Sequence, residues 1–183
     1  MNLEMSVNEV VNLVIGFVLG IVASWAFWYW KINIKPRIAI SPMCAYDPDS
    51  GALGIRVINR SRRQATDIKV RLLVAQVQGS WYDTIYTPVL NRESLFALRP
   101  YKRPMKFWRL PASSIFETQD GAKIVELLSQ QGQTERRLIF TLSATDTLSS
   151  SKVIQRVSYQ LSDIQVGDFK SGRHFVILPK HLT

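Results

Sequence analysis

An uncharged apolar segment of 21 residues, Val10 to Trp30, constrains this chain more than any other feature. As an α-helix rising about 1.5 Å per residue, it is about 31 Å long, which matches the hydrocarbon core of a bilayer. Its last residues are mostly aromatic, as is typical of the headgroup level. The sequence therefore predicts one transmembrane helix over residues 10–30, preceded by a short extracytoplasmic N-terminus at residues 1–9.

The flanks of this segment favour an uncleaved anchor over a signal peptide. The stretch before it is acidic through Glu4 and Glu9, and its downstream end is bulky and unlike a cleavage site. Lys31, Lys35 and Arg37 follow the segment, so the positive-inside rule places the N-terminus outside and residues 31–183 in the cytoplasm. We therefore expect a single-pass protein of the cell's inner membrane.

Charge and cysteine content agree with a cytoplasmic domain beside a membrane. The whole chain has a formal charge of +9, and residues 1–30 contain two glutamates and no Lys or Arg, so residues 31–183 carry +11. Each cation near an anionic leaflet contributes about 1 kcal/mol of attraction. The only cysteine, Cys44, has no partner for an intramolecular disulfide. We expect the basic linker at 31–37, with Lys31, Lys35 and Arg37, to contact anionic lipids.

Residues 38–179 have the pattern of one mainly β domain, followed by a tail at 180–183. Apolar residues alternate with polar ones over 65–77, where one face is predicted to be buried and the other solvated. Turn sequences separate the predicted strands, notably Asp47 to Gly51, Arg99-Pro100, Asp120-Gly121 and Gly167-Asp168. The predicted strands cover residues 37–44, 53–58, 65–77, 82–90, 93–98, 106–110, 135–142, 151–161 and 173–178.

One helix is predicted in this domain, over residues 121–131. Ile124, Leu127 and Leu128 have helical spacing, Asp120 is the expected N-cap, and Gly132 is near the expected end. Eight or nine short strands with turn sequences between them favour an immunoglobulin-like antiparallel β-sandwich.

The sequence of the domain resembles the cytoplasmic domain of inward-rectifier potassium channels. In that family a basic linker leads into a strand, a glycine turn, an Arg-Val-x-Asn strand and a Val-Arg-x-x-Leu strand. Arg56-Val57-Ile58-Asn59 and Val70-Arg71-Leu72-Leu73 lie at those places here. The later family pattern Gln-x-Arg-x-Ser-Tyr, followed by a corner, is matched by Gln155, Arg156, Ser158, Tyr159, Asp163, Ile164 and Gly167.

The resemblance covers about residues 31–179 and is weakest between 80 and 135. The sequence has no pore helix and no selectivity filter, so the chain alone cannot be a potassium-selective channel. What the resemblance implies is a cytoplasmic sandwich that assembles as a four-fold ring, and hence a tetramer, below the membrane.

The apolar helix contains its own signal for self-association. Gly16 and Gly20 form a GxxxG motif, and Ser24 extends this stripe of small residues. Asn12 lies four residues before Gly16, and a polar residue in a membrane helix is costly unless it has a partner or water. We expect Asn12, Gly16, Gly20 and Ser24 to form a helix–helix interface; the alternatives are a lipid-facing stripe and an Asn12 hydrated at the outer headgroups.

Two basic clusters are candidate sites for a phosphate or another anionic ligand. They are also typical of a solvated loop and of an edge strand protected by cations. Interleaved aromatic residues in the second cluster would suit nucleic acid, but Pro100 and Pro104 limit regular structure, and nucleic acid is the least favoured partner. The clusters are Arg60, Arg62 and Arg63, and Arg99, Lys102, Arg103, Lys106 and Arg109.

The sequence gives little support to catalysis. His174 and His181 have no metal-ligand companion at suitable spacing, and Cys44 has no recognisable base partner. Glycine-rich phosphate loops and hydrolase motifs are absent from the sequence. We expect a non-enzyme without cofactors or metals.

Three functions follow as hypotheses. The first is a homo-oligomeric, membrane-anchored sandwich that binds a nucleotide or protein partner and couples it to the membrane, including as a pore-forming effector in bacterial self-sacrificing defence. The second is an auxiliary or anchoring subunit of another membrane complex. The third is a membrane-tethered nucleic-acid binder.

Overall fold

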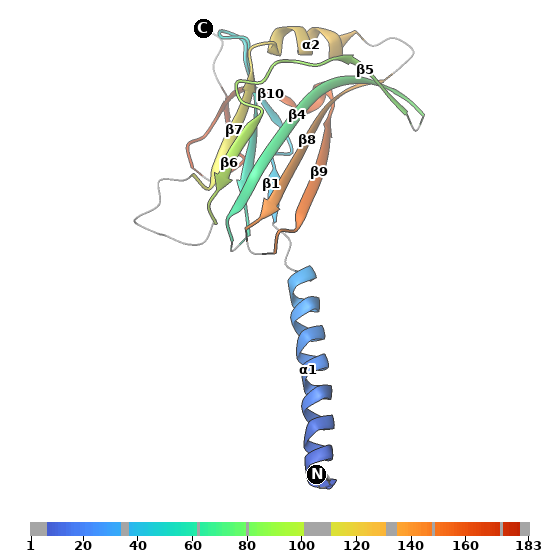
Figure 1. Cartoon of the computed structure of the whole chain (residues 1–183). Coiled ribbons are helices and arrows are strands. Elements are labelled where there is room, and N and C mark those ends of the chain that lie inside the picture. Colours follow the sequence, from blue (N-terminus) through green and yellow to red (C-terminus); the bar gives the residue numbers. More distant parts are fainter. Residues whose placement is uncertain are drawn as a thin grey trace. The chain divides into compact units, whose positions relative to one another are not determined.

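The structure is a computed structural model, and it describes residues 7–33, 37–61, 63–79, 81–100, 111–130, 135–147, 149–172 and 174–179. The chain divides into two compact units, residues 1–35 and 36–183. The first is a single helix, and the second is a mainly β domain built from two sheets (Figure 1).

The first unit contains helix α1, Val7–Asn33. Its stretch from Asn8 to Trp30 is long and apolar enough to cross a membrane, and none of it is buried against the protein. A helix suits such a sequence because it satisfies its backbone hydrogen bonds internally, without water. The helix continues through residues 31–33, which the sequence assigned to the basic linker.

The first sheet has the strand order β1-β3-β2-β10-β11, and β7 pairs with the other edge of β3. All its pairs are antiparallel except β2 with β10, which run parallel. The wholly antiparallel sandwich predicted from sequence is wrong at this pair. The strands are β1 Ile38–Ile40, β2 Cys44–Asp47, β3 Ala52–Asn59, β7 Ser113–Thr118, β10 Ile164–Phe169 and β11 Ile177–Pro179.

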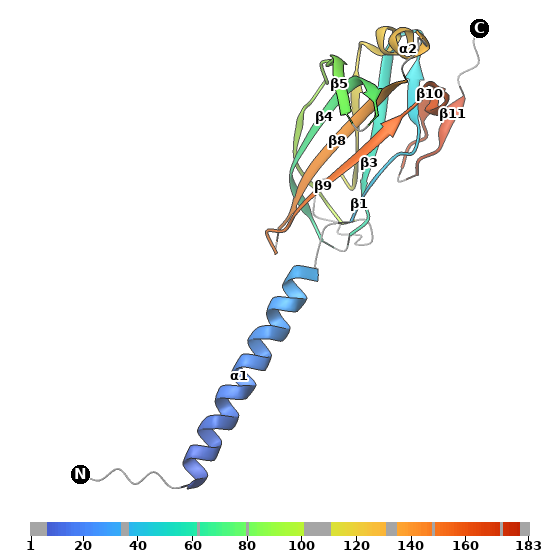
Figure 2. The same cartoon turned by 90° about the vertical axis from the view of Figure 1, so that its right-hand side faces the viewer.

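The second sheet has the order β5-β4-β8-β9 (Figure 2). Strand β6 pairs with the first part of β4. Strand β4 forms its centre because its 14 residues alternate core and outward positions along most of their length. The strands are β4 Ala65–Gln78, β5 Trp81–Tyr86, β6 Ser94–Leu98, β8 Arg136–Asp146 and β9 Lys152–Tyr159.

One hydrophobic core lies between the inner faces of the two sheets. The ring centroids of Phe116 in β7 and Phe140 in β8 are 6.1 Å apart, which joins the sheets at the centre of the core. The Tyr159 hydroxyl of β9 donates a 2.6 Å hydrogen bond to the carbonyl of Ser41, the residue after β1. The prediction of a mainly β domain is confirmed, and so is the buried face expected for β4; in β9 only Tyr159 is buried.

The predicted helix is confirmed as α2, Gly121–Ser129; Gly132 lies outside the described residues. Asp120 is at the N-cap position, but its side chain does not cap the helix. Its Oδ2 instead accepts a 2.9 Å hydrogen bond from the Tyr86 hydroxyl at the end of β5. The carboxylate therefore ties the helix to a strand. A short 3-10 helix, η1, spans Leu161–Asp163.

Other sequence predictions differ in detail. The strand expected at 37–44 is interrupted at residues 41–43, where Ser41 hydrogen-bonds to Arg56, and resumes as β2. Strands β7 and β10 were not predicted. The turn expected at Gly167-Asp168 lies inside β10, because Gly167 adopts a φ of 141° and stays paired with β11. The strand expected at 106–110 lies outside the described residues.

Candidate functional site at the basic end of the sandwich

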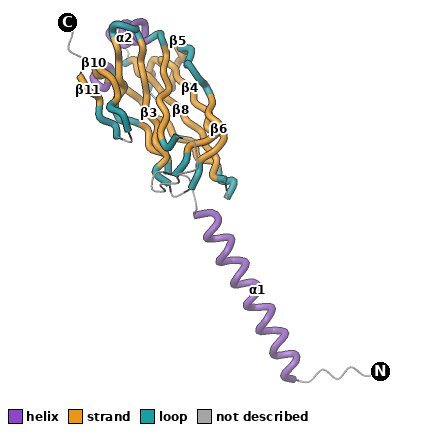
Figure 3. The backbone as a smooth tube through the Cα atoms, turned by 90° about the vertical axis from the view of Figure 1, so that its left-hand side faces the viewer, coloured by secondary structure: helices purple, strands orange, loops and turns teal. Residues whose placement is uncertain are grey.

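Four segments of the domain meet at one end of the sandwich, opposite α2 (Figures 1 and 3). They are the start of β1, the β3–β4 loop, the segment that follows β6, and the β8–β9 loop. We call this end of the sandwich the basic end. The first three of these segments supply its four arginines, which are Arg37, Arg60, Arg63 and Arg99.

Asn59, the last residue of β3, joins two of these segments. Its buried side-chain amide donates hydrogen bonds of 2.8 Å to the carbonyl of Arg63 and 2.9 Å to the carbonyl of Leu98. Its backbone N–H donates to the carbonyl of Ala112 at 3.0 Å. Asn59 therefore brings the first predicted cluster, at residues 60–63, beside the start of the second cluster at Arg99.

The start of β1 lies in the same place because β1 pairs with the end of β3. The backbone N–H of Arg60 donates a 2.7 Å hydrogen bond to the carbonyl of Arg37, next to the Ile38–Asn59 pair. Both arginine residues are exposed, and the guanidinium of Arg60 lies 5.5 Å from the ring centroid of Phe175. The aromatic ring holds the cation at the surface without neutralising it.

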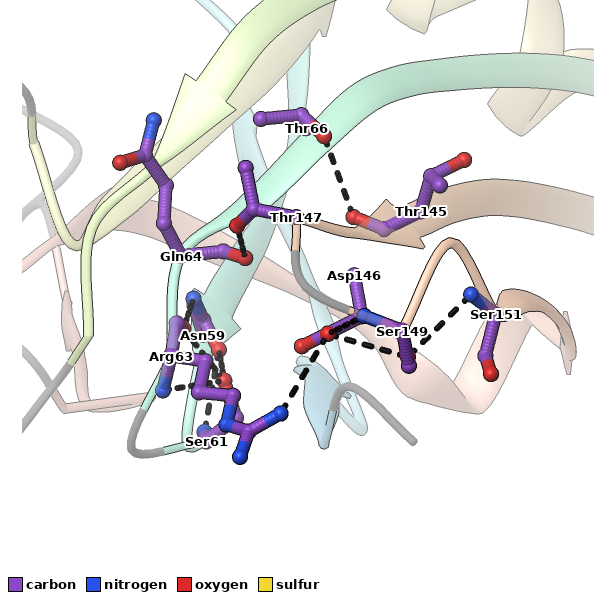
Figure 4. A network of polar contacts seen from close by, with 10 residues as sticks. All are labelled: Asn59, Ser61, Arg63, Gln64, Thr66, Thr145, Asp146, Thr147, Ser149 and Ser151. Atoms are coloured by element: carbon purple, nitrogen blue, oxygen red, sulfur yellow. Dashed lines mark hydrogen bonds and ion pairs between the residues drawn. The ribbon is translucent and has the colours of Figure 1, made fainter. Parts of the chain in front are cut away.

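The β3–β4 loop takes its shape from a side chain. The backbone N–H of Ser61 donates a 3.0 Å hydrogen bond to Asn59 Oδ1, which is the two-residue pattern of an Asx-turn. The turn presents Arg63 to the β8–β9 loop, where its Nη1 lies 3.8 Å from Asp146 Oδ1 (Figure 4).

Asp146 is 1 % exposed, so its charge needs partners inside the protein. Besides Arg63, its Oδ1 accepts hydrogen bonds from the backbone N–H and the hydroxyl of Ser149, at 2.9 and 3.0 Å. The hydroxyl of Thr147 donates to the carbonyl of Gln64 at 2.8 Å and ties the two loops together (Figure 4). This network makes Arg63 a structural cation, unlike Arg37 and Arg60.

Arg99 is the first residue of the second predicted cluster. Its backbone N–H donates a 3.0 Å hydrogen bond to the carbonyl of Pro111, which brings Pro111 beside the end of β6. The Nε atom of Arg99 is buried and has no hydrogen-bond partner in the described part of the chain. Several predicted site residues lie outside the described residues: Lys35, Arg62, Lys102, Arg103, Lys106 and Arg109. Lys31 lies in the last turn of α1, but its side chain is not described.

The basic end is suited to binding anions. Within the described ranges, no carboxylate lies within 4.0 Å of the side-chain nitrogens of Arg37 or Arg60. Guanidinium groups that are exposed and free of acidic partners offer paired donors to phosphate or carboxylate oxygens.

The small-residue stripe of α1 forms the second predicted site. Gly16, Gly20 and Ser24 line one groove on the helix, and its walls are large side chains: Phe17, Ile21, Trp25 and Trp28. A methyl group added at either glycine would meet no atom within 4 Å. Asn12 is exposed one turn before Gly16. Among the described residues nothing fills the groove, and the helix–helix interface stays a prediction.

The described residues give no geometry for metal binding, because they contain no group of three or more His, Cys, Asp or Glu side chains able to hold an ion. Cys44 is fully buried, and burial, reinforced by the charge of Asp163, raises the pKa of its thiol. The thiol therefore has little thiolate character.

Sequence reasoning missed the side chains that organise the basic end. Neither Asn59 nor Asp146 is among the site residues expected from the sequence. The Asn59-x-Ser61 pattern after a strand is a recognisable Asx-turn signal. No comparable signal points to the Arg63–Asp146 contact, because it joins residues 83 positions apart.

No protein-family model matches this chain, and no curated protein matches it significantly in sequence. The class of protein is therefore defined by the structure: a mainly β, two-sheet domain with one N-terminal helix apolar enough to span a membrane.

Proposed function

We propose that this chain is a non-catalytic, single-pass membrane protein whose β domain binds anionic headgroups or ligands through its basic end and assembles into a homo-oligomer. The observation that carries the proposal is the convergence of Arg37, Arg60 and Arg99 at the end of the sandwich where the chain arrives from α1.

The short connection between α1 and the β domain supports the proposal that the basic end lies beside the bilayer. Only residues 34–36 lie between the last residue of α1 and Arg37. Even fully extended, this connection spans about 14 Å. If α1 spans the membrane, Arg37 must lie close to the headgroups. The other residues of the basic end must then lie near the headgroups too.

Electrostatics supports an anionic inner leaflet as the surface involved. Residues 31–183 carry a formal charge of +11, and the acidic residues Glu4 and Glu9 lie on the other side of the apolar segment. Cations within a Debye length of an anionic leaflet gain about 1 kcal/mol each. The same distribution favours the N-out, domain-in orientation.

Self-association is supported by the open groove along Gly16, Gly20 and Ser24. The resemblance to inward-rectifier cytoplasmic domains supports an immunoglobulin-like sandwich and a ring of copies below the membrane. In this proposal the ring senses a ligand, and the bundle of α1 helices transmits its state to the bilayer.

The experiment that tests the proposal is hydrogen exchange on the full chain in nanodiscs. We expect backbone amides at 59–64 and at 98–100 to exchange more slowly in discs with anionic phosphatidylglycerol than in phosphatidylcholine alone. Arg37→Glu with Arg60→Glu should abolish this difference. Arg92→Glu, an exposed cation outside the basic end, is the control and should retain it. Equal exchange in both lipids would refute the headgroup contact.

A further inference from the structure

The outward face of the second sheet carries cations that the proposed function does not use. Strand register aligns Arg71, Thr141 and Arg156 in one cross-strand row, and Thr66, Thr145 and Lys152 in another. Lys69, Ser143 and Ile154 form the row between them. We call this surface the basic face. It points away from the core, since the alternate positions of β4 and β8, with Val157 and Tyr159 of β9, belong to the hydrophobic cluster.

Most of the charge on the basic face is not neutralised. Lys69 pairs with Asp67 at 3.4 Å. In the described part of the chain, no carboxylate lies within 4.0 Å of the side-chain nitrogens of Arg71, Lys152 or Arg156. These three side chains are exposed, and Ile154 between them is 67 % exposed. The basic face therefore combines exposed cations with one exposed apolar side chain near its centre.

The outward face of the first sheet has the opposite character. It holds a cavity of about 300 Å³ whose lining includes Gly54 and Phe169. Three carboxylates line the cavity, and among the described residues no Lys or Arg lines it, although the chain as a whole is strongly basic. These residues are Asp47, Glu117 and Asp168.

Glycine at position 54 keeps this cavity open. A Cβ there would lie 3.2 Å from Ile115 Cγ2 and 3.5 Å from Glu117 Cγ. The space left is large enough for the end of an arginine or lysine side chain. The acidic cavity and the basic face are therefore complementary in charge, and they lie on the outer sides of two sheets whose inner sides share one core.

Because the two surfaces point away from each other, they cannot meet within one chain. We propose that they meet between copies, with the basic face of one domain docking on the acidic cavity of the next. This inference deepens the proposed homo-oligomer by naming its interface, and it rests on that proposal.

The membrane anchor determines which type of oligomer such a contact can form. Copies inserted in the same orientation are related by rotations about the membrane normal and by shifts within the membrane plane. A contact between two different surfaces repeats from copy to copy and closes into a ring when the rotation allows. Two like faces would repel each other, so a dimer through equivalent faces is disfavoured. Nucleic acid suits the basic face less well, since no aromatic side chain lies in these rows for base stacking.

Charge reversal tests the contact in the full chain in detergent micelles, with copy number measured by cross-linking. Arg71→Glu with Arg156→Glu should weaken association by about tenfold or more, and so should Glu117→Arg with Asp168→Arg. All four changes together restore opposite signs and should recover much of the association. Arg92→Glu and Asp83→Arg, which lie on neither surface, should leave the copy number unchanged.

Cysteine pairing tests the same contact without changing the sign of a face. Arg156→Cys with Asp168→Cys in one chain should give a ladder of disulfide-linked oligomers on oxidation, while either change alone should give no ladder. The buried Cys44 is not expected to compete. A ladder from Arg156→Cys alone would mean that like faces meet and would overturn the proposal.

A separate variant distinguishes failure of this inference from failure of the proposed function. Gly16→Leu with Gly20→Leu alters only the helix groove. If it reduces the copy number while the charge reversals and cysteine pair have no effect, the oligomer stands and the face-to-cavity contact is refuted. If the unmodified chain is a monomer in micelles and in nanodiscs, both proposals fail.

Discussion

At the scale of single residues, Arg56 has a different role from the other arginines of the domain. It lies in β3 and is 4 % exposed. Its Nη1 donates 2.7 Å hydrogen bonds to the carbonyls of Lys170 and His174, and its guanidinium lies 4.7 Å from the ring centroid of Phe169. Arg56 therefore holds the segment between β10 and β11 against the first sheet.

Arg56→Met should lower the free energy of unfolding by about 2–4 kcal/mol, because two carbonyls and an aromatic ring lose a charged partner. Urea unfolding of the full chain in micelles measures the loss, and hydrogen exchange at residues 170–178 locates it. Arg92→Met, at an exposed position outside both the basic face and the basic end, should change stability by no more than about 0.5 kcal/mol. Equal effects of the two changes would contradict the role assigned to Arg56.

At the scale of elements, the β10–β11 pair depends on a glycine inside a strand. Gly167 has a φ of 141°, and a Cβ at this position would collide with the carbonyl oxygen of Leu178 in β11. The pairing runs from Gly167 opposite Pro179, through Asp168 opposite Leu178, to Phe169 opposite Ile177. A side chain at 167 must therefore separate the two strands.

Gly167→Ala should destabilise the domain by about 2 kcal/mol or more and expose the amides of β11 to exchange. Gly172→Ala is the matched control: its φ is also positive, 114°, but an added Cβ meets only His174 Cδ2, at 4.0 Å. In thermal unfolding, the midpoint temperature of Gly167→Ala should lie well below that of Gly172→Ala. Identical unfolding temperatures would show that the collision with β11 is relieved at no cost.

At the scale of the whole molecule, function depends on which side of the membrane the domain occupies. We expect protease added to intact cells to spare residues 37–179 and an N-terminal tag to be accessible. Glu4→Lys and Glu9→Lys, combined with Lys31→Glu, Lys35→Glu and Arg37→Glu, should invert this pattern in at least part of the population, because cytoplasmic Lys and Arg set orientation. Cleavage of the unmodified domain from outside would contradict the proposed topology.

Local regularities explain the parts of the fold that could be predicted. Three patterns each reflect which face of a single helix or strand avoids water. They are the apolar run of α1, the alternation along β4 and the helical spacing of Ile124 and Leu128. Strands β7 and β10 were missed for the same reason. Their burial comes from neighbours distant in sequence, such as Leu53 opposite Thr118 and Cys44 opposite Ile164, and not from a period of their own.

The amino-acid sequence by itself determined the apolar helix, the mainly β character of the domain and the existence of separate basic clusters, since each depends on composition or on neighbours a few positions apart. Only the tertiary structure decided that Asn59 brings Arg60 and Arg99 to one end, and that unpartnered cations and an acidic cavity lie on opposite sheets. Strand order and register set these distances, and both are fixed by packing across the whole core.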